Sequence, residues 1–225
     1  MNNKKIKDAA IFYSCLSALF VAALVTTNLI ANKFVSVDLG FHTFKISAGV
    51  LPYPITFLIT DILSEIYGQK KTQRVVFAGF LAAVFVLAIL WLGHQFPAID
   101  DSPVSDQEYE TVFKSSGRVI FSSMLAYLAA QFVDVRLFHF WKRLTKGKHL
   151  WLRNNFSTVL SQLTDTTLVV AVLFWGRMEI TEMGVLILNG WVFKVLVAAA
   201  DTPVLYAAVW GIKKYFKLQP GEEIQ

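Results

Sequence analysis

Several ionisable side chains of this sequence lie inside long apolar runs, where a charge is costly. In the stretch PYPITFLITDILSEIYG, residues 52–68, Asp61 and Glu65 are four residues apart among isoleucine, leucine and phenylalanine. Residues at this spacing share one face of a helix, so both carboxyl groups would project from the same side. A carboxylate at the centre of a bilayer costs about 2.5–3.5 kcal/mol on insertion scales. The pair therefore predicts a polar cavity or a buried internal contact.

Polar residues of the same kind recur in the later apolar runs. The candidate binding residues are Asp61, Glu65, Asp134, Asn155, Gln162, Asp165, Lys194 and Asp201. Hydrogen bonds that hold helices together would explain the asparagine and glutamine well. They explain the five acids poorly, because Lys194 is the one lysine deep in an apolar run. Protonation, water or a polar ligand must balance the remaining carboxyl groups.

The apolar runs that carry these residues are long enough to cross a membrane. Of 225 residues, 55% are hydrophobic and 16% are charged, against about a quarter charged in an ordinary soluble domain. About 20 apolar residues span the roughly 30 Å of hydrocarbon in a bilayer. We predict an all-α membrane protein that forms a single domain over residues 1–225. Its six transmembrane helices are expected at about Ala9–Ala31, Val50–Tyr67, Val75–Phe96, Ser116–Phe140, Phe156–Gly176 and Gly184–Trp210.

Lysine and arginine are concentrated in alternate loops. Residues 4–7, 70–74, 142–153 and 213–217 hold most of them, whereas the acidic run 100–110 falls in the other set of loops. Because positive loops are retained in the cytoplasm, both termini of this multi-pass inner-membrane protein are predicted to be cytoplasmic. The net charge of +5 suits contact with anionic membrane lipid and gives no reason to expect a nucleic-acid partner.

The first outer loop has its own pattern. In VSVDLGFHTFKIS, residues 35–47, apolar and polar residues alternate on both sides of Gly40. This pattern predicts a short β-hairpin, in a position to cap a cavity.

The sequence lacks the motifs of common catalytic sites. GQKKT, residues 68–72, is not a phosphate-binding loop, and neither HExxH nor GxSxG occurs. No catalytic residue, metal site or cofactor is predicted, and an intramembrane enzyme is disfavoured.

Three segments together resemble a known family. They are LPYPITFLITDILSEIYGQKKTQRVV, QFVDVRLFHFWKRLTKGKHLWLRNNFSTVLSQLTDT and FKVLVAAADTPVLY, in this order. The sequence is similar to the queuosine precursor transporter family, also described as vitamin-uptake-transporter-like. The likeness extends from the first span to Tyr206, and the acidic loop 97–114 is the part that it does not explain.

The resemblance implies a fold akin to the substrate-binding components of energy-coupling-factor importers. It also implies uptake of 7-cyano-7-deazaguanine and 7-aminomethyl-7-deazaguanine, the 7-deazapurine precursors of queuosine. Such a base presents two adjacent N–H donors beside a carbonyl acceptor. One carboxylate accepts both donors, and Lys194 or an amide can donate to the carbonyl. Tyr53, Phe57 and Phe156 are candidates for stacking on the base.

Two modes of transport stay open. A standalone transporter would move the base down its gradient, whereas a substrate-binding subunit would need a separate ATPase and coupling protein. The alanine-repeat helix that such subunits show early in the chain does not occur in this sequence, which favours the standalone transporter. Proton coupling, the preferred deazapurine and assembly into a homo-oligomer also stay open.

Overall fold

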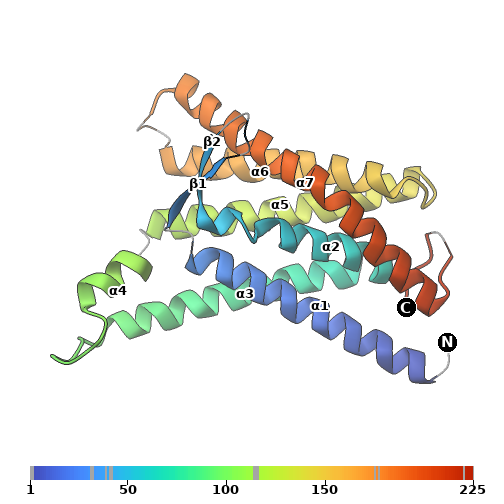
Figure 1. The fold of residues 1–225 in the computed structure, drawn as a ribbon, viewed down its shortest axis with the longest axis horizontal. Helices are drawn as coiled ribbons and strands as arrows, with labels where there is room; N and C mark the ends of the chain where they lie inside the picture. The colour runs from blue at the N-terminus through green and yellow to red at the C-terminus, as the bar shows by residue number, and fades with distance from the viewer. Residues whose placement is uncertain are drawn as a thin grey trace.

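A computed structural model describes residues 3–30, 33–38, 40, 43–113, 117–174, 176, 178–219 and 221–224. The elements are α1 (Asn3–Leu29), β1 (Phe34–Asp38), β2 (Thr43–Ser47), the 3₁₀ turn η1 (Ala48–Val50), α2 (Tyr53–Tyr67), α3 (Gln69–His94), α4 (Asp106–Phe113), α5 (Gly117–Leu144), α6 (Leu150–Phe174) and α7 (Ile180–Phe216). The longer helices run along the long axis of the molecule (Figure 1). The strands and α4 lie toward one end, here called the hairpin end, and both termini lie at the other, the termini end.

Each of the predicted spans overlaps one of the longer helices. Of the described helices, four are long and apolar enough to cross a membrane: Asn3–Leu29, Ala48–Tyr67, Gln69–His94 and Ile180–Phe216. Helices α5 and α6 have 28 and 25 residues, which at 1.5 Å per residue suffices in length, but they are not among those four. The chain is therefore a multi-pass membrane protein, and six crossings stay a prediction. The predicted span ends Ala31 and Ser116 lie outside the described residues.

The predicted hairpin is confirmed. Strands β1 and β2 pair antiparallel, with Val35 opposite Ile46 and Val37 opposite Phe44. The buried ring of Phe44 lies with its centroid 5.0 Å from that of Phe193 on α7. The hairpin is thereby fixed to the bundle, and η1 leads directly from it into α2.

Helix α2 is the buried centre of the bundle. Within its membrane-length window 61% of the residues are buried, against 17–22% in the other three candidate spans. Leu63 and Ile66 of α2 pack in one apolar cluster with Phe20 of α1 and Val76 of α3. Because lipid tails are as apolar as these side chains, such contacts stabilise a membrane bundle through van der Waals packing. Because lipid offers no hydrogen-bond partners, the polar side chains of α2 must find theirs inside the protein.

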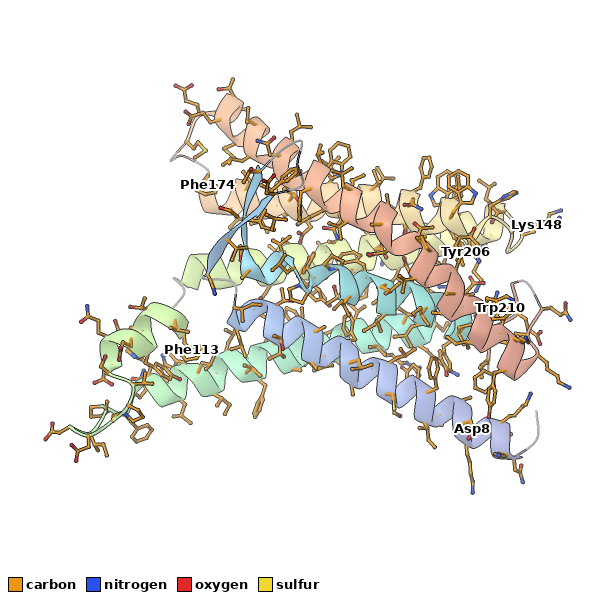
Figure 2. All side chains as sticks on the ribbon, viewed as in Figure 1. Asp8, Phe113, Lys148, Phe174, Tyr206 and Trp210 are labelled. Atoms are coloured by element: carbon orange, nitrogen blue, oxygen red, sulfur yellow. The ribbon has the colours of Figure 1, made fainter. Side chains whose placement is uncertain are left out.

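The two ends of the bundle provide markers for its orientation. Figure 2 shows Asp8, Lys148 and Trp210 toward the termini end, and Phe113 and Phe174 toward the hairpin end. Lys5 Nζ on α1 donates to the backbone oxygen of Tyr215 on α7 at 2.6 Å, which joins the two terminal helices.

We expect the termini end to face the cytoplasm, because the positively charged loops lie there. Ser102→Cys places a thiol at a partly exposed position of the hairpin end, and Lys148→Cys places one at an exposed position of the termini end, each in a Cys15→Ala background. A membrane-impermeant maleimide applied to intact cells should label position 102 and leave position 148 unlabelled, while permeabilised cells label both. Labelling of 148 but not 102 in intact cells would show the opposite orientation.

Candidate functional site

A cavity of about 240 Å³ lies between the helices on the hairpin side of the bundle. Its polar lining comes from α1, β2, α2, α5, α6 and α7, through Thr27, Asn28, Ser47, Tyr53, Tyr127, Asp165 and Lys194. The rest of the lining is mostly apolar and includes Leu24, Met124 and Val169. Drug-sized ligands occupy pockets of roughly 300–1,000 Å³, so this cavity suits a smaller molecule. Apolar walls with a few convergent polar groups are typical of a binding site.

The central feature of the cavity is an ion pair between α6 and α7. Lys194 Nζ lies 2.5 Å from Asp165 Oδ2 and also donates to Thr166 Oγ1 at 3.2 Å. The Tyr53 hydroxyl donates to the other carboxylate oxygen, Oδ1, at 3.0 Å. The side chains of Asp165 and Lys194 are 6% and 16% exposed. Lys194 therefore neutralises Asp165. Each carboxylate oxygen of Asp165 accepts one hydrogen bond, Oδ2 from Lys194 and Oδ1 from Tyr53.

Aromatic rings surround this ion pair. The Lys194 ammonium lies 5.1 Å from the centroid of the Tyr53 ring, within cation–π range. The Tyr53 ring lies 6.4 Å from that of Tyr127 and 5.4 Å from that of Phe57. Of the predicted stacking residues, Tyr53 lines the cavity and Phe57 lines a narrow pocket beside it, whereas Phe156 is 45% exposed.

Tyr127 is a cavity residue that sequence reasoning missed. It precedes Gln131 and Asp134 by four and seven residues, which places the three side chains on one face of α5. The helical spacing from Gln131 and Asp134 could therefore have identified Tyr127 from the sequence.

Two more of the predicted binding residues line the narrow pocket beside the cavity. Gln162 and Asp201 line it, and it shares Val50, Tyr53 and Lys194 with the larger cavity. The structure thus brings Asp165, Lys194, Gln162 and Asp201 to one polar region.

Asp61 and Asp134 form a separate pair, deeper along α2 and α5. They are 1% and 0% exposed, and neither lines the cavity or the narrow pocket. Ser161 Oγ donates to Asp134 Oδ1 at 3.0 Å, whereas Asp61 Oδ1 and Asp134 Oδ2 are buried without a hydrogen-bond partner among the described residues. Buried carboxyl oxygens without a partner are costly, so these two acids are a separate feature from the cavity.

Asn155 lies outside the cavity and joins two helices. Its amide donates to Thr202 Oγ1 on α7 at 3.0 Å and to the backbone oxygen of Trp151 at 2.9 Å. Polar contacts of this kind hold membrane helices together.

Glu65 lies in a cluster of cations near the termini end. Arg153 Nη2 lies 2.6 Å and Lys142 Nζ 3.7 Å from its Oε2, and Lys213 Nζ pairs with its Oε1. The Glu65 side chain is fully buried. Twelve residues of α2 separate Tyr53 from Glu65, about 18 Å at 1.5 Å per residue. Glu65 is therefore remote from the cavity, and it ties α2 to α5, α6 and α7.

Sequence reasoning missed these three partners. Lys142, Arg153 and Lys213 belong to the positive set used to orient the chain. They come from three different helices, so no spacing along the sequence predicts their convergence.

Comparisons with known proteins agree on one family. The model of a family described as "Putative vitamin uptake transporter" matches residues 47–208, a segment that contains all the predicted binding residues. A "Probable queuosine precursor transporter" of Bacillus subtilis is 31% identical over 161 residues, 71% of this chain and 70% of the relative. A "Queuosine precursor transporter" of Escherichia coli is 27% identical over 168 residues, 71% of this chain and 67% of the relative. No solved structure gives a significant match.

The Glu65 cluster yields a stability prediction. Glu65→Gln keeps the size of the side chain but leaves three cations without their shared carboxylate. Breaking a buried ion pair on one side costs about 3–5 kcal/mol, so the melting temperature of the purified protein in detergent should fall clearly. The exposed acid Glu182 of α7 provides the matched control, Glu182→Gln, which should melt like the parent protein. Equal melting of both variants would show that the cluster does not hold the bundle together.

Proposed function

This chain belongs to the vitamin uptake transporter family, and from that premise we propose that it imports 7-deazaguanine precursors of queuosine. The substrates are 7-cyano-7-deazaguanine and 7-aminomethyl-7-deazaguanine, and the binding site is the cavity at Asp165 and Lys194. The names of the relatives support the substrate class. The observation that carries the site is a buried carboxylate in the cavity wall, flanked by a lysine and a tyrosine.

The chemistry of the ion pair fits the polar edge of such a base. The ring N–H and the exocyclic amine are adjacent donors, and a carboxylate accepts both in a bidentate contact. In this arrangement Asp165 exchanges its present partners, Lys194 and Tyr53, for the base. Lys194 then donates to the neighbouring carbonyl oxygen of the same edge. The exchange conserves the number of hydrogen bonds that the Asp165 carboxylate accepts, so the carboxylate is not left unpaired.

The walls of the cavity fit the flat face of the base. Tyr53 and Tyr127 lie on α2 and α5, and their rings are close enough to contact one planar ligand in edge and face orientations. Met124 adds a polarizable apolar surface that adapts to an aromatic ring.

Transport needs access to the cavity from both sides of the membrane in turn. Ser47 of β2 and Gly49 of η1 line the cavity, so it lies toward the hairpin end. From the lysine and arginine distribution we expect this end to face the outside. Its occupant would be taken from the outside and released at the termini end, in the cytoplasm. We therefore propose a standalone inner-membrane transporter with both termini in the cytoplasm.

Replacing the carboxylate tests the binding site. Asp165→Asn keeps one acceptor oxygen and turns the other into a donor, so it cannot accept two N–H groups. Loss of one charged hydrogen bond costs about 1.5–3 kcal/mol, or roughly 10- to 150-fold in affinity. Titration calorimetry of the purified protein with 7-cyano-7-deazaguanine should show this loss. The exposed acid Asp101 supplies the matched control, Asp101→Asn, which should bind like the parent.

A double variant separates binding from folding. Asp165→Asn alone leaves the Lys194 charge without its carboxylate partner, so we expect it to lower the melting temperature. Asp165→Asn combined with Lys194→Met removes both charges and should recover much of that stability. It should still fail to bind the base. Parent-like affinity in a well-folded double variant would remove this ion pair from the binding site.

A further inference from the structure

The chain folds back onto the termini end after α7. Helix α7 ends at its C-cap residue Lys217, which has a left-handed φ of +61°. The Leu218 N–H donates to the Lys213 backbone oxygen at 3.0 Å. The Ile224 N–H then donates to the Ile66 oxygen at the end of α2, at 2.7 Å. Lys71 Nζ on α3 donates to the Ile224 oxygen at 3.2 Å. The tail, here residues 217–219 and 221–224, is therefore fixed to α2 and α3 through the backbone of Ile224.

The side chains of the tail enter the bundle as well. Ile224 is 7% exposed and belongs to the same apolar cluster as Leu63 and Ile66 of α2. Glu223 Oε1 accepts a hydrogen bond from Lys142 Nζ at 2.8 Å, and that lysine also lies 3.7 Å from Glu65 Oε2. The tail thus supplies a second carboxylate to the Glu65 cluster.

The charges of the cluster favour this second carboxylate. Among the described residues, Lys142, Arg153 and Lys213 contribute three positive charges, against one negative charge from Glu65. The Lys142 side chain is only 7% exposed, so water screens it poorly. Unpaired buried charge is costly, and Glu223 reduces the excess from two positive charges to one.

The Glu223 carboxylate of the tail lies against Gly68, the residue between α2 and α3. The φ of Gly68 is +81°, a left-handed conformation that favours glycine. A Cβ atom at this position would lie 2.1 Å from Glu223 Oε2. The turn that ends α2 therefore leaves the space which the Glu223 carboxylate occupies.

We propose that the tail is a latch on the exit of the transport path. It is docked while the cavity is open toward the hairpin end, and it must be released before the bound molecule leaves at the termini end. The Glu65 cluster and Glu223 hold together the ends of α2, α5, α6 and α7, and these same helices carry Tyr53, Tyr127, Asp165 and Lys194. Separation of those ends is the movement that opens the exit. The gating role rests on the proposed transport function, whereas the docking does not.

Thiol labelling tests the docking in the full chain without any ligand. In a Cys15→Ala background, Ile224→Cys places a thiol at the buried position and Glu222→Cys places one at an exposed position two residues earlier. Labelling in isolated membranes should be at least tenfold slower at 224 than at 222. Adding Glu223→Gln should accelerate labelling at 224, and adding the neighbouring Glu222→Gln should not. Equal rates at 222 and 224 would overturn the latch.

Release of substrate tests the gating. In proteoliposomes preloaded with 7-cyano-7-deazaguanine, Glu223→Gln should exchange the base at least threefold faster than the parent, with unchanged binding affinity. Glu222→Gln should exchange it at the parental rate. If Glu223→Gln frees the tail in the labelling assay but leaves exchange unchanged, the tail does not gate the exit. If the parent does not bind the base, the proposed function and the gating role both fail, and the labelling result alone decides the docking.

Discussion

The bundle depends on one buried carboxylate. Glu65 lies at the end of the most buried helix and pairs with a cation from each of three other helices. In a membrane, apolar packing distinguishes poorly between helix neighbours, because lipid is as apolar as the side chains. A buried acid with several cationic partners specifies which helices meet and at which level along their length. Helices α2, α5, α6 and α7 are thereby set in register.

That register determines where the other polar groups can act. With the cations collected at the termini end, Lys194 is left to neutralise Asp165 near the hairpin end. Asp61 and Asp134 are buried on α2 and α5 between the two sites. The polar interior is therefore divided into a closed cluster at one end and a cavity at the other. Under the proposed transport function, this division corresponds to one state of an alternating-access cycle.

The sequence predicted the elements well and the contacts poorly. Hydropathy located the long helices, and alternation around Gly40 located the hairpin, because both patterns are local. The pairing of Lys194 with Asp165 and of Glu65 with Arg153 joins residues 29 and 88 positions apart. Spacing along a single helix gives the face on which a residue lies and does not give the helix that it faces. For the same reason, charges that orient the chain in the membrane were not recognised as partners of a buried acid.

Uptake into liposomes can decide whether this one chain carries a 7-deazaguanine across a membrane. Purified protein reconstituted without ATP or any other protein should take up radiolabelled 7-cyano-7-deazaguanine with saturable kinetics. Excess unlabelled base should compete, whereas excess adenine, which lacks the adjacent N–H donors beside a carbonyl, should not. Protein-free liposomes set the background. Uptake no faster than this background, or uptake that appears only with an added ATPase, would show that this chain is not a standalone transporter of the base.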